Sequence, residues 1–161
     1  MKKMIFAAFA ALLTVGCGNY TADKNEMITD TFPQEMGYTL TREDTINAMA
    51  LAFVKQESNF NHTAVSPCGQ WVGCLQLSEI MVREANRIVG FDCFNYNDRY
   101  DRQGSYAIFR IVQQHHNPNL EIDRAIDIWN RHCTAKYRNN VKNYFTHNLQ
   151  NYSNIENYFE L

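Results

Sequence analysis

The first well-marked helical pattern in the chain lies between residues 41 and 58. Its apolar residues recur at intervals of three and four positions, and they are Ile46, Met49, Ala50, Phe53 and Val54. This spacing places them on one face of an α-helix. At about 100° per residue, Glu57 lies roughly 20° from Ile46, near the middle of the same apolar face.

Both ends of this predicted helix are marked in the sequence. Thr41 can cap the N-terminus, with Asp44 three residues later in the capping-box position. Asn59, Pro67 and other turn residues follow Glu57 closely, so the helix should end just after it. Burial and the negative end of the helix dipole both disfavour a carboxylate there. We therefore expect a raised pKa for Glu57, which suits a proton donor. A frayed end or a buried arginine partner are the structural alternatives.

The first 16 residues have the pattern of an export signal. Two lysines precede an apolar stretch, residues 4–15, that is too short to span a bilayer comfortably. Gly16 and Cys17 close the sequence LLTVGC, which resembles a bacterial lipobox whose cysteine is lipidated. An ordinary signal peptide is the alternative. We expect a lipoprotein of the cell envelope, anchored through Cys17 in the outer membrane and facing the periplasm.

The remaining chain is expected to contain one folded domain. Residues 17–40 are polar and weakly patterned, and we interpret them as a tether that gives the domain reach from the membrane. Residues 41–161 are expected to form a single all-α domain of roughly five to seven helices. The formal net charge is −2, with charged residues at 20%, so no basic patch points to a nucleic-acid partner.

Export changes the interpretation of the cysteines. With Cys17 set aside, four remain, and an oxidising compartment favours two disulfides with three connectivities. From the spacing we predict a Cys68–Cys74 and a Cys93–Cys133 disulfide. Structural zinc is the alternative, but the sequence lacks a C-x-x-C pair. We expect neither a metal nor a cofactor.

A run of motifs begins at Glu57. It comprises ESNFN at 57–61, AVSP at 64–67, Gly69 and VGCLQ at 72–76, followed by DRQGSYAIFRIV at 101–112, AIDIWNRH at 125–132 and KYRNNVKNYF at 136–145. In this order the motifs resemble the soluble lytic transglycosylases of bacterial cell walls, over about residues 42–145. Gly104 matches a buried glycine of that family. The chain has one extra residue between Ser66 and Gln76, and Trp129 stands in the place of a tyrosine.

The resemblance implies a lysozyme-like helical fold with a groove for peptidoglycan strands. It implies that Glu57 cleaves the β-1,4 bond between N-acetylmuramic acid and N-acetylglucosamine. The acid protonates the leaving oxygen and then takes the proton of the muramic acid C6 hydroxyl, closing a 1,6-anhydro ring. Family residues that line the site map to Ser66, Gln76 and Asn130, with Trp129 as a saccharide platform. Taken alone, Ser66 also suits a turn, Gln76 a cap and Trp129 the core.

A second catalytic carboxylate is not evident. Between Glu57 and Asp92 the only acids are Glu79 and Glu84, and both are expected on the solvated face of an amphipathic helix. Ordinary glycosidases use two carboxylates, so internal attack is favoured. The alternatives are a muramidase-type hydrolase, in which an acid such as Glu79 faces Glu57, and a non-catalytic peptidoglycan-binding lipoprotein. General wall turnover and service to an envelope-spanning secretion or conjugation machine both fit.

Overall fold

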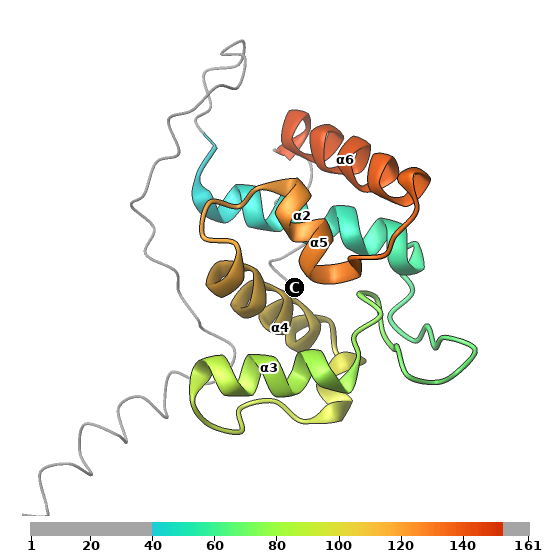
Figure 1. Ribbon diagram of the computed structural model, residues 1–161, viewed down its shortest axis with the longest axis vertical. Coiled ribbons are helices and arrows are strands. Elements are labelled where there is room, and N and C mark those ends of the chain that lie inside the picture. The colour runs from blue at the N-terminus through green and yellow to red at the C-terminus, as the bar shows by residue number, and fades with distance from the viewer. Residues whose placement is uncertain (1–39, 153–161) are drawn as a thin grey trace, which may run out of the picture.

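The computed structural model describes residues 40–152, and this part of the chain is all-α (Figure 1). The helices are α2 (Arg42–Ser58), α3 (Glu79–Val89), α4 (Arg102–His116), α5 (Ile122–Asn130) and α6 (Ala135–Gln150), with a short 3₁₀ helix, η1 (Tyr96–Arg99). In the α2–α3 connection, Val72 forms isolated antiparallel bridges with Val65 and with Leu77. The expected all-α class is therefore confirmed.

Several expectations fall outside the described residues. The export signal, Cys17 and the tether up to residue 39 lie there, as do the last nine residues of the expected domain. These expectations stay predictions. Among residues 40–152, no helix is long and apolar enough to cross a membrane, and no cluster of histidine, cysteine and acidic side chains could hold a metal ion.

Helix α2 is the central helix of the fold. Its capping box forms as predicted: Thr41 N donates to Asp44 Oδ2 at 2.7 Å, and Asp44 N donates to Thr41 Oγ1 at 3.1 Å. The predicted single apolar face is too narrow, however, because every residue from Asp44 to Val54 is buried. Helices α6 and α4 pack against α2 (Figure 1), so even polar positions of α2 are covered.

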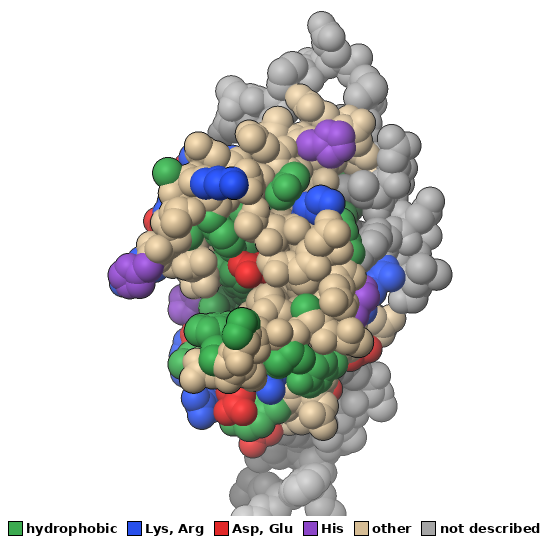
Figure 2. All heavy atoms as spheres, turned by 90° about the vertical axis from the view of Figure 1, so that its right-hand side faces the viewer, with side chains coloured by type: hydrophobic (Ala, Val, Ile, Leu, Met, Phe, Trp, Pro, Cys, Tyr) green, Lys and Arg blue, Asp and Glu red, His purple; other side chains and the backbone are tan. Residues whose placement is uncertain are grey.

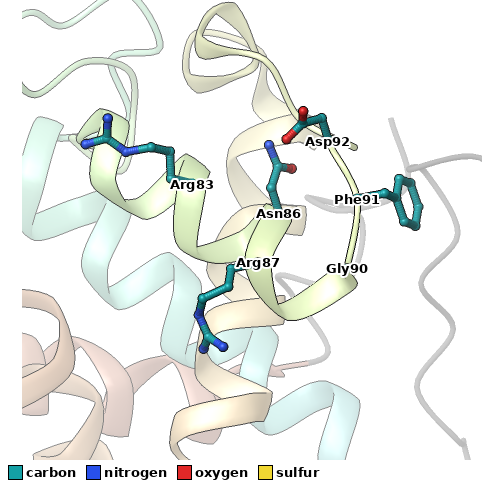
Figure 3. Close-up of a pocket in the computed structure, with 6 residues that line it drawn as sticks. All are labelled: Arg83, Asn86, Arg87, Gly90, Phe91 and Asp92. Carbon is teal, nitrogen blue, oxygen red and sulfur yellow. The ribbon is translucent and has the colours of Figure 1, made fainter.

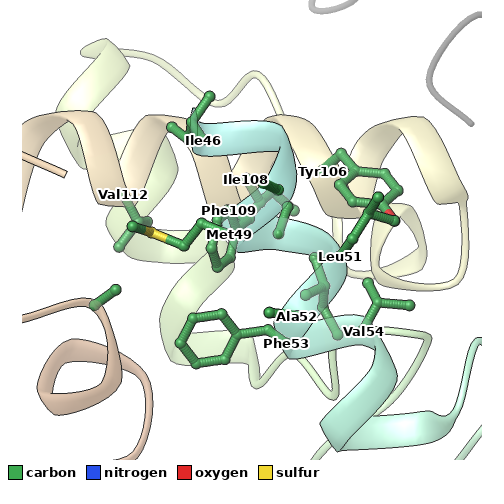
Figure 4. Packing of buried hydrophobic residues seen from close by; sticks show 14 of the residues in the cluster. Ile46, Met49, Leu51, Ala52, Phe53, Val54, Tyr106, Ile108, Phe109 and Val112 are labelled. Atoms are coloured by element: carbon green, nitrogen blue, oxygen red, sulfur yellow. The ribbon is translucent and has the colours of Figure 1, made fainter. Parts of the chain in front are cut away.

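The core lies where α2 meets α4. Figure 4 shows Met49 and Phe53 of α2 beside Phe109 and Val112 of α4. The rings of Phe53 and Phe109 lie 5.5 Å apart, a separation typical of favourable aromatic pairs. This packing fixes the direction in which α2 carries its C-terminal turn.

Polar contacts tie α6 to α2. Asn148 Nδ2 donates to the carbonyl oxygen of Ala48 at 2.9 Å, and Asn47 Nδ2 donates to the buried Tyr152 hydroxyl at 3.1 Å. Because these partners are about one hundred residues apart, the contacts close the domain. They hold the end of α6 and the residues that follow it against the N-terminal half of α2.

A close approach of α4 to η1 requires Gly104. A Cβ at this position would lie 2.8 Å from the carbonyl oxygen of Asp98, which is too near for any other residue without backbone movement. Ser105 then donates from Oγ to the carbonyl oxygen of Arg99 at 2.8 Å. Gly104 itself is half-buried rather than buried as expected, and the close approach that it allows sets the position of η1.

The two predicted disulfide pairings are wrong. Cys68, Cys74 and Cys133 are free thiols, so neither predicted pair forms. Cys68 is exposed in the α2–α3 connection, whereas Cys74 is buried in the core, and burial raises the pKa of its thiol to about 11. The second pair fails because Cys93 follows α3, which packs mainly on α4, while Cys133 precedes α6, which packs mainly on α2. The spacing of the cysteines in the sequence does not reveal which helices pack together.

Candidate active site

Glu57 lies in the last turn of α2, where the helix leaves the core. Its side chain is half-buried, while that of Lys55 is exposed. The chain turns sharply immediately afterwards, because Asn59 (φ 52°) and Phe60 (φ 67°) both adopt the left-handed conformation. Two successive left-handed residues other than glycine are uncommon. The turn ends α2 directly after Ser58 and leaves Glu57 at the junction of the core and the following loop.

The hydrogen-bond partner of Glu57 is Tyr137, in the first turn of α6. The Tyr137 hydroxyl donates to Glu57 Oε1. Burial and the nearby Glu57 charge raise the pKa of Tyr137, so the phenol stays protonated and remains a donor. Sequence reasoning missed this role. The motif KYRNNVKNYF contained Tyr137, but nothing in a single sequence pairs it with a residue 80 positions earlier.

The pKa of Glu57 is raised, as the sequence predicted. Burial is the main cause, and the hydrogen bond from Tyr137 opposes it less strongly. Among residues 40–152, no lysine, arginine or histidine forms an ion pair with Glu57. The alternative of a buried arginine partner is therefore removed. The carboxyl group therefore keeps its proton to a higher pH than an exposed glutamate does.

A loop is fastened to the end of α2 beside Glu57. Ser58 Oγ donates to the carbonyl oxygen of Cys74 at 2.8 Å. Gln76, itself left-handed at φ 48°, donates from Nε2 to the carbonyl oxygens of Gly73 at 2.9 Å and Ala64 at 3.2 Å. The side chain of Gln76 thus organises the loop that follows Glu57. Its Nε2 is occupied by the backbone, and a substrate contact would fall to its carbonyl oxygen.

Gly73 is a residue of this loop, at a position that has no room for a side chain. Its φ is +78°, and a Cβ would lie 1.8 Å from the carbonyl oxygen of Arg99. The buried Arg99 guanidinium also holds the loop, because its Nη1 donates to the carbonyl oxygens of Gln70 and Leu77, each at 3.4 Å. Arg99 of η1 therefore packs against the loop and holds it in place.

The other predicted site residues occupy different environments. Ser66 N donates to the carbonyl oxygen of Trp71 at 2.9 Å, and Ser66 Oγ accepts from Trp71 N at 3.1 Å. This matches the turn alternative for Ser66. The Trp129 ring lies 5.6 Å from that of Phe53 and 5.0 Å from that of Phe109, so it packs on the core. Asn130 is exposed at the end of α5.

The two acids after Glu57 have no evident catalytic arrangement. Glu79 is exposed at the start of α3. Glu84 accepts two hydrogen bonds from Arg87, each at 2.7 Å, and lies 2.6 Å from His116 Nε2. The hydrogen bonds from Arg87 and then His116 lower the pKa of Glu84 to about 2. Glu84 is thus a paired carboxylate rather than a proton donor.

The surface at the C-terminal end of α2 is hollowed. Figure 2 views the molecule from the right-hand side of Figure 1, where α2 ends and α6 begins. A depression separates an upper and a lower part of this face, and acidic side-chain atoms are visible inside it.

A second concavity lies at the C-terminal end of α3 (Figure 3). Its lining residues are Arg83, Asn86, Arg87, Gly90, Phe91 and Asp92. Asn86 is already used by the backbone, donating to Phe94 O at 2.8 Å and accepting from Phe94 N at 2.8 Å. Arg87 is paired with Glu84. The polar groups here are largely engaged by the fold, and none of the predicted site residues lines this concavity.

Comparison with known proteins adds no family assignment. No family model, no curated protein and no solved structure matches this chain. Glu57, its surroundings and the motifs are therefore the features that bear on function.

Proposed function

We propose that this protein is a lytic transglycosylase that cleaves peptidoglycan strands. The observation that carries the proposal is Glu57: a half-buried carboxyl group with a raised pKa, held by the hydroxyl of Tyr137 at the edge of the core. A carboxylic acid that retains its proton is what glycosidic bond cleavage requires. The resemblance of the surrounding motifs to the lytic transglycosylases specifies the substrate class, and a lysozyme-like arrangement of the helices belongs to the same proposal.

In the proposed reaction Glu57 first donates its proton to the glycosidic oxygen as the bond from C1 of N-acetylmuramic acid breaks. The resulting carboxylate then accepts the proton of the C6 hydroxyl, and O6 bonds to C1. The acid is restored, and no water is consumed. Tyr137 donates a hydrogen bond to the carboxylate between the two steps, which stabilises its charge in a partly desolvated site.

The competing functions have less support. A hydrolase on two carboxylates needs a second acid facing Glu57, but Glu84 is engaged by Arg87 and His116 and Glu79 is exposed. A purely glycan-binding lipoprotein has no use for a carboxyl group of raised pKa. Neither wall turnover nor service to an envelope machine follows from the described residues, and both remain compatible with the proposed activity.

Product analysis tests the proposal directly. Purified protein should release fragments from wall sacculi that end in 1,6-anhydro-muramic acid, lighter by one water than the products of lysozyme. Mass spectrometry distinguishes the two. Reducing ends would assign the protein to the hydrolases, and sacculi bound without any release would assign it to the binding proteins.

We expect Tyr137→Phe to shift the pH dependence of cleavage. The hydrogen bond from Tyr137 lowers the pKa of Glu57, so its loss should raise that pKa further. Because Glu57 must be protonated to act, the fall of kcat/KM at high pH should move to higher pH, while kcat falls roughly tenfold or more with loss of the bond that stabilises the carboxylate. The measurement is kcat/KM against pH for both proteins. An unchanged dependence of kcat/KM on pH would show that Tyr137 has no part in catalysis.

Anchoring is tested by Cys17→Ser. Lipidation at Cys17 would hold the enzyme at the outer membrane while residues 18–40 let it reach the wall. The substitution should move the protein from the membrane fraction to the soluble fraction of the periplasm, as immunoblotting of both fractions would reveal. Recovery of the unaltered protein in the soluble fraction would contradict the lipobox interpretation.

A further inference from the structure

We propose that Trp71 is a stacking platform for a sugar of the glycan strand, at a distance from the bond that is cleaved. This inference rests on the proposed function, since it concerns the same substrate. It assigns a binding role to a residue that the motifs did not single out.

Trp71 belongs to a short hairpin-like loop with a fixed backbone. Val65 and Val72 form an antiparallel bridge, and Gly73 N donates to the carbonyl oxygen of Ala64 at 2.8 Å. Next to this bridge, both backbone groups of Trp71 are bonded to Ser66, its N–H to Oγ at 3.1 Å and its carbonyl oxygen to N–H at 2.9 Å. The loop therefore presents Trp71 in a defined position, with little conformational entropy to lose on binding.

The indole of Trp71 is not used by the fold. The residue is 46% exposed, although tryptophan is usually well buried. The chain has a second tryptophan for comparison: Trp129 packs on Phe53 and Phe109, whereas within residues 40–152 Trp71 has no ring partner. A rigidly held, exposed indole is typical of a recognition surface.

The loop is attached to the helix that carries Glu57. Ser58, the neighbour of Glu57, donates to the carbonyl oxygen of Cys74. Trp71 is three residues from Cys74, so their Cα atoms are at most about 11 Å apart. Arg99 supports the same segment through the carbonyl oxygen of Gln70. An oligosaccharide bound at Glu57 can therefore extend to Trp71.

The surroundings of Trp71 favour an uncharged polymer as its ligand. Residues 58–78 contain no aspartate, glutamate, lysine or arginine. A nucleic acid or an anionic lipid surface would call for basic residues here. The apolar ring face instead suits the C–H face of a pyranose. N-acetylated sugars of the wall strand have this chemistry.

Binding is measured in the Glu57→Gln protein so that no sugar is consumed. The probe is a β-1,4-linked hexasaccharide of N-acetylglucosamine, followed by tryptophan fluorescence and by calorimetry. We expect the probe to change the emission of Glu57→Gln and expect Trp71→Ala in that background to abolish the change and weaken binding about five- to tenfold. Trp71→Phe should retain part of the affinity. Phe91→Ala is the matched control, because Phe91 is 48% exposed but lies at the far end of α3.

The outcomes separate the inference from the proposed function. Equal affinity of Trp71→Ala and its parent, with sacculi still cleaved by the unaltered protein, would overturn the role of Trp71 alone. A loss of affinity in Phe91→Ala as large as in Trp71→Ala would also overturn it, because the effect would not be specific to the loop. Absence of both cleavage and sugar binding in the unaltered protein would overturn the proposed function, and the inference with it.

Discussion

Glu57→Gln should lower the rate of glycan cleavage by at least about 10²–10⁴-fold, the range attributed to general acid–base catalysis. The amide keeps the shape of the side chain and can still accept the hydrogen bond of Tyr137. It cannot donate a proton to the glycosidic oxygen or recover one from the C6 hydroxyl. Release of soluble fragments from sacculi at matched protein concentration measures the effect.

The matched control is Glu79→Gln, which removes an exposed acid from the start of α3. Its activity should stay close to that of the unaltered protein. A loss comparable to that of Glu57→Gln would point instead to a two-carboxylate hydrolase. Full activity of Glu57→Gln would refute the mechanism altogether.

Glu57→Gln should leave the stability of the fold unchanged or slightly increased at neutral pH. A carboxyl group whose pKa is raised in the folded state stabilises the fold fully below its unfolded pKa, and that contribution is lost as the pH rises through the folded value. The advantage of Glu57→Gln over the unaltered protein should therefore grow with pH across this window. Urea unfolding at several pH values measures it.

Gly73→Ala should destabilise the protein by about 3 kcal/mol or more, an effect found only where the fold cannot adjust. The new Cβ would meet the backbone oxygen of Arg99 at 1.8 Å, and the positive φ of +78° adds strain for any side chain. Relief requires the loop and η1 to separate, so the position of the loop beside Glu57 should be lost as well. Chemical denaturation and sacculus cleavage report the two effects.

Gly69→Ala provides the control for backbone strain alone. Gly69 has a similar φ of +73°, but nothing lies within 4 Å of the Cβ that would be added. Its cost should be only about 1–2 kcal/mol, the penalty of a left-handed residue with a side chain. If the two variants lost the same stability, contact with Arg99 would not be the reason for glycine at position 73.

The sequence predicted the features that depend on local order. The capping box at Thr41, the end of α2 after Glu57 and the raised pKa all follow from residues within a few turns of one another. The fully buried surface of α2 did not follow, because two later helices cover its polar positions. Periodicity describes one helix at a time and carries no information on its neighbours.

The missed features depend on distant contacts. Tyr137 reaches Glu57 from α6, and the Trp129 ring lies against Phe53 of α2 and Phe109 of α4. The cysteine prediction was wrong for a related reason: the bridges of Val72 with Val65 and Leu77 place the following Cys74 inside the core, while Cys68 remains outside. The number of residues between two cysteines does not indicate whether each thiol faces the core or the solvent.

The contact between Glu57 and Tyr137 also has a consequence for timing. Translation delivers the acid 80 residues before its partner, and the partner is in place only once α6 has packed along α2. A chain that is incomplete or has not yet folded lacks the assembled pair. The proposed wall-cutting activity is thereby delayed until the domain has closed, so that cleavage of the envelope begins only with the finished molecule.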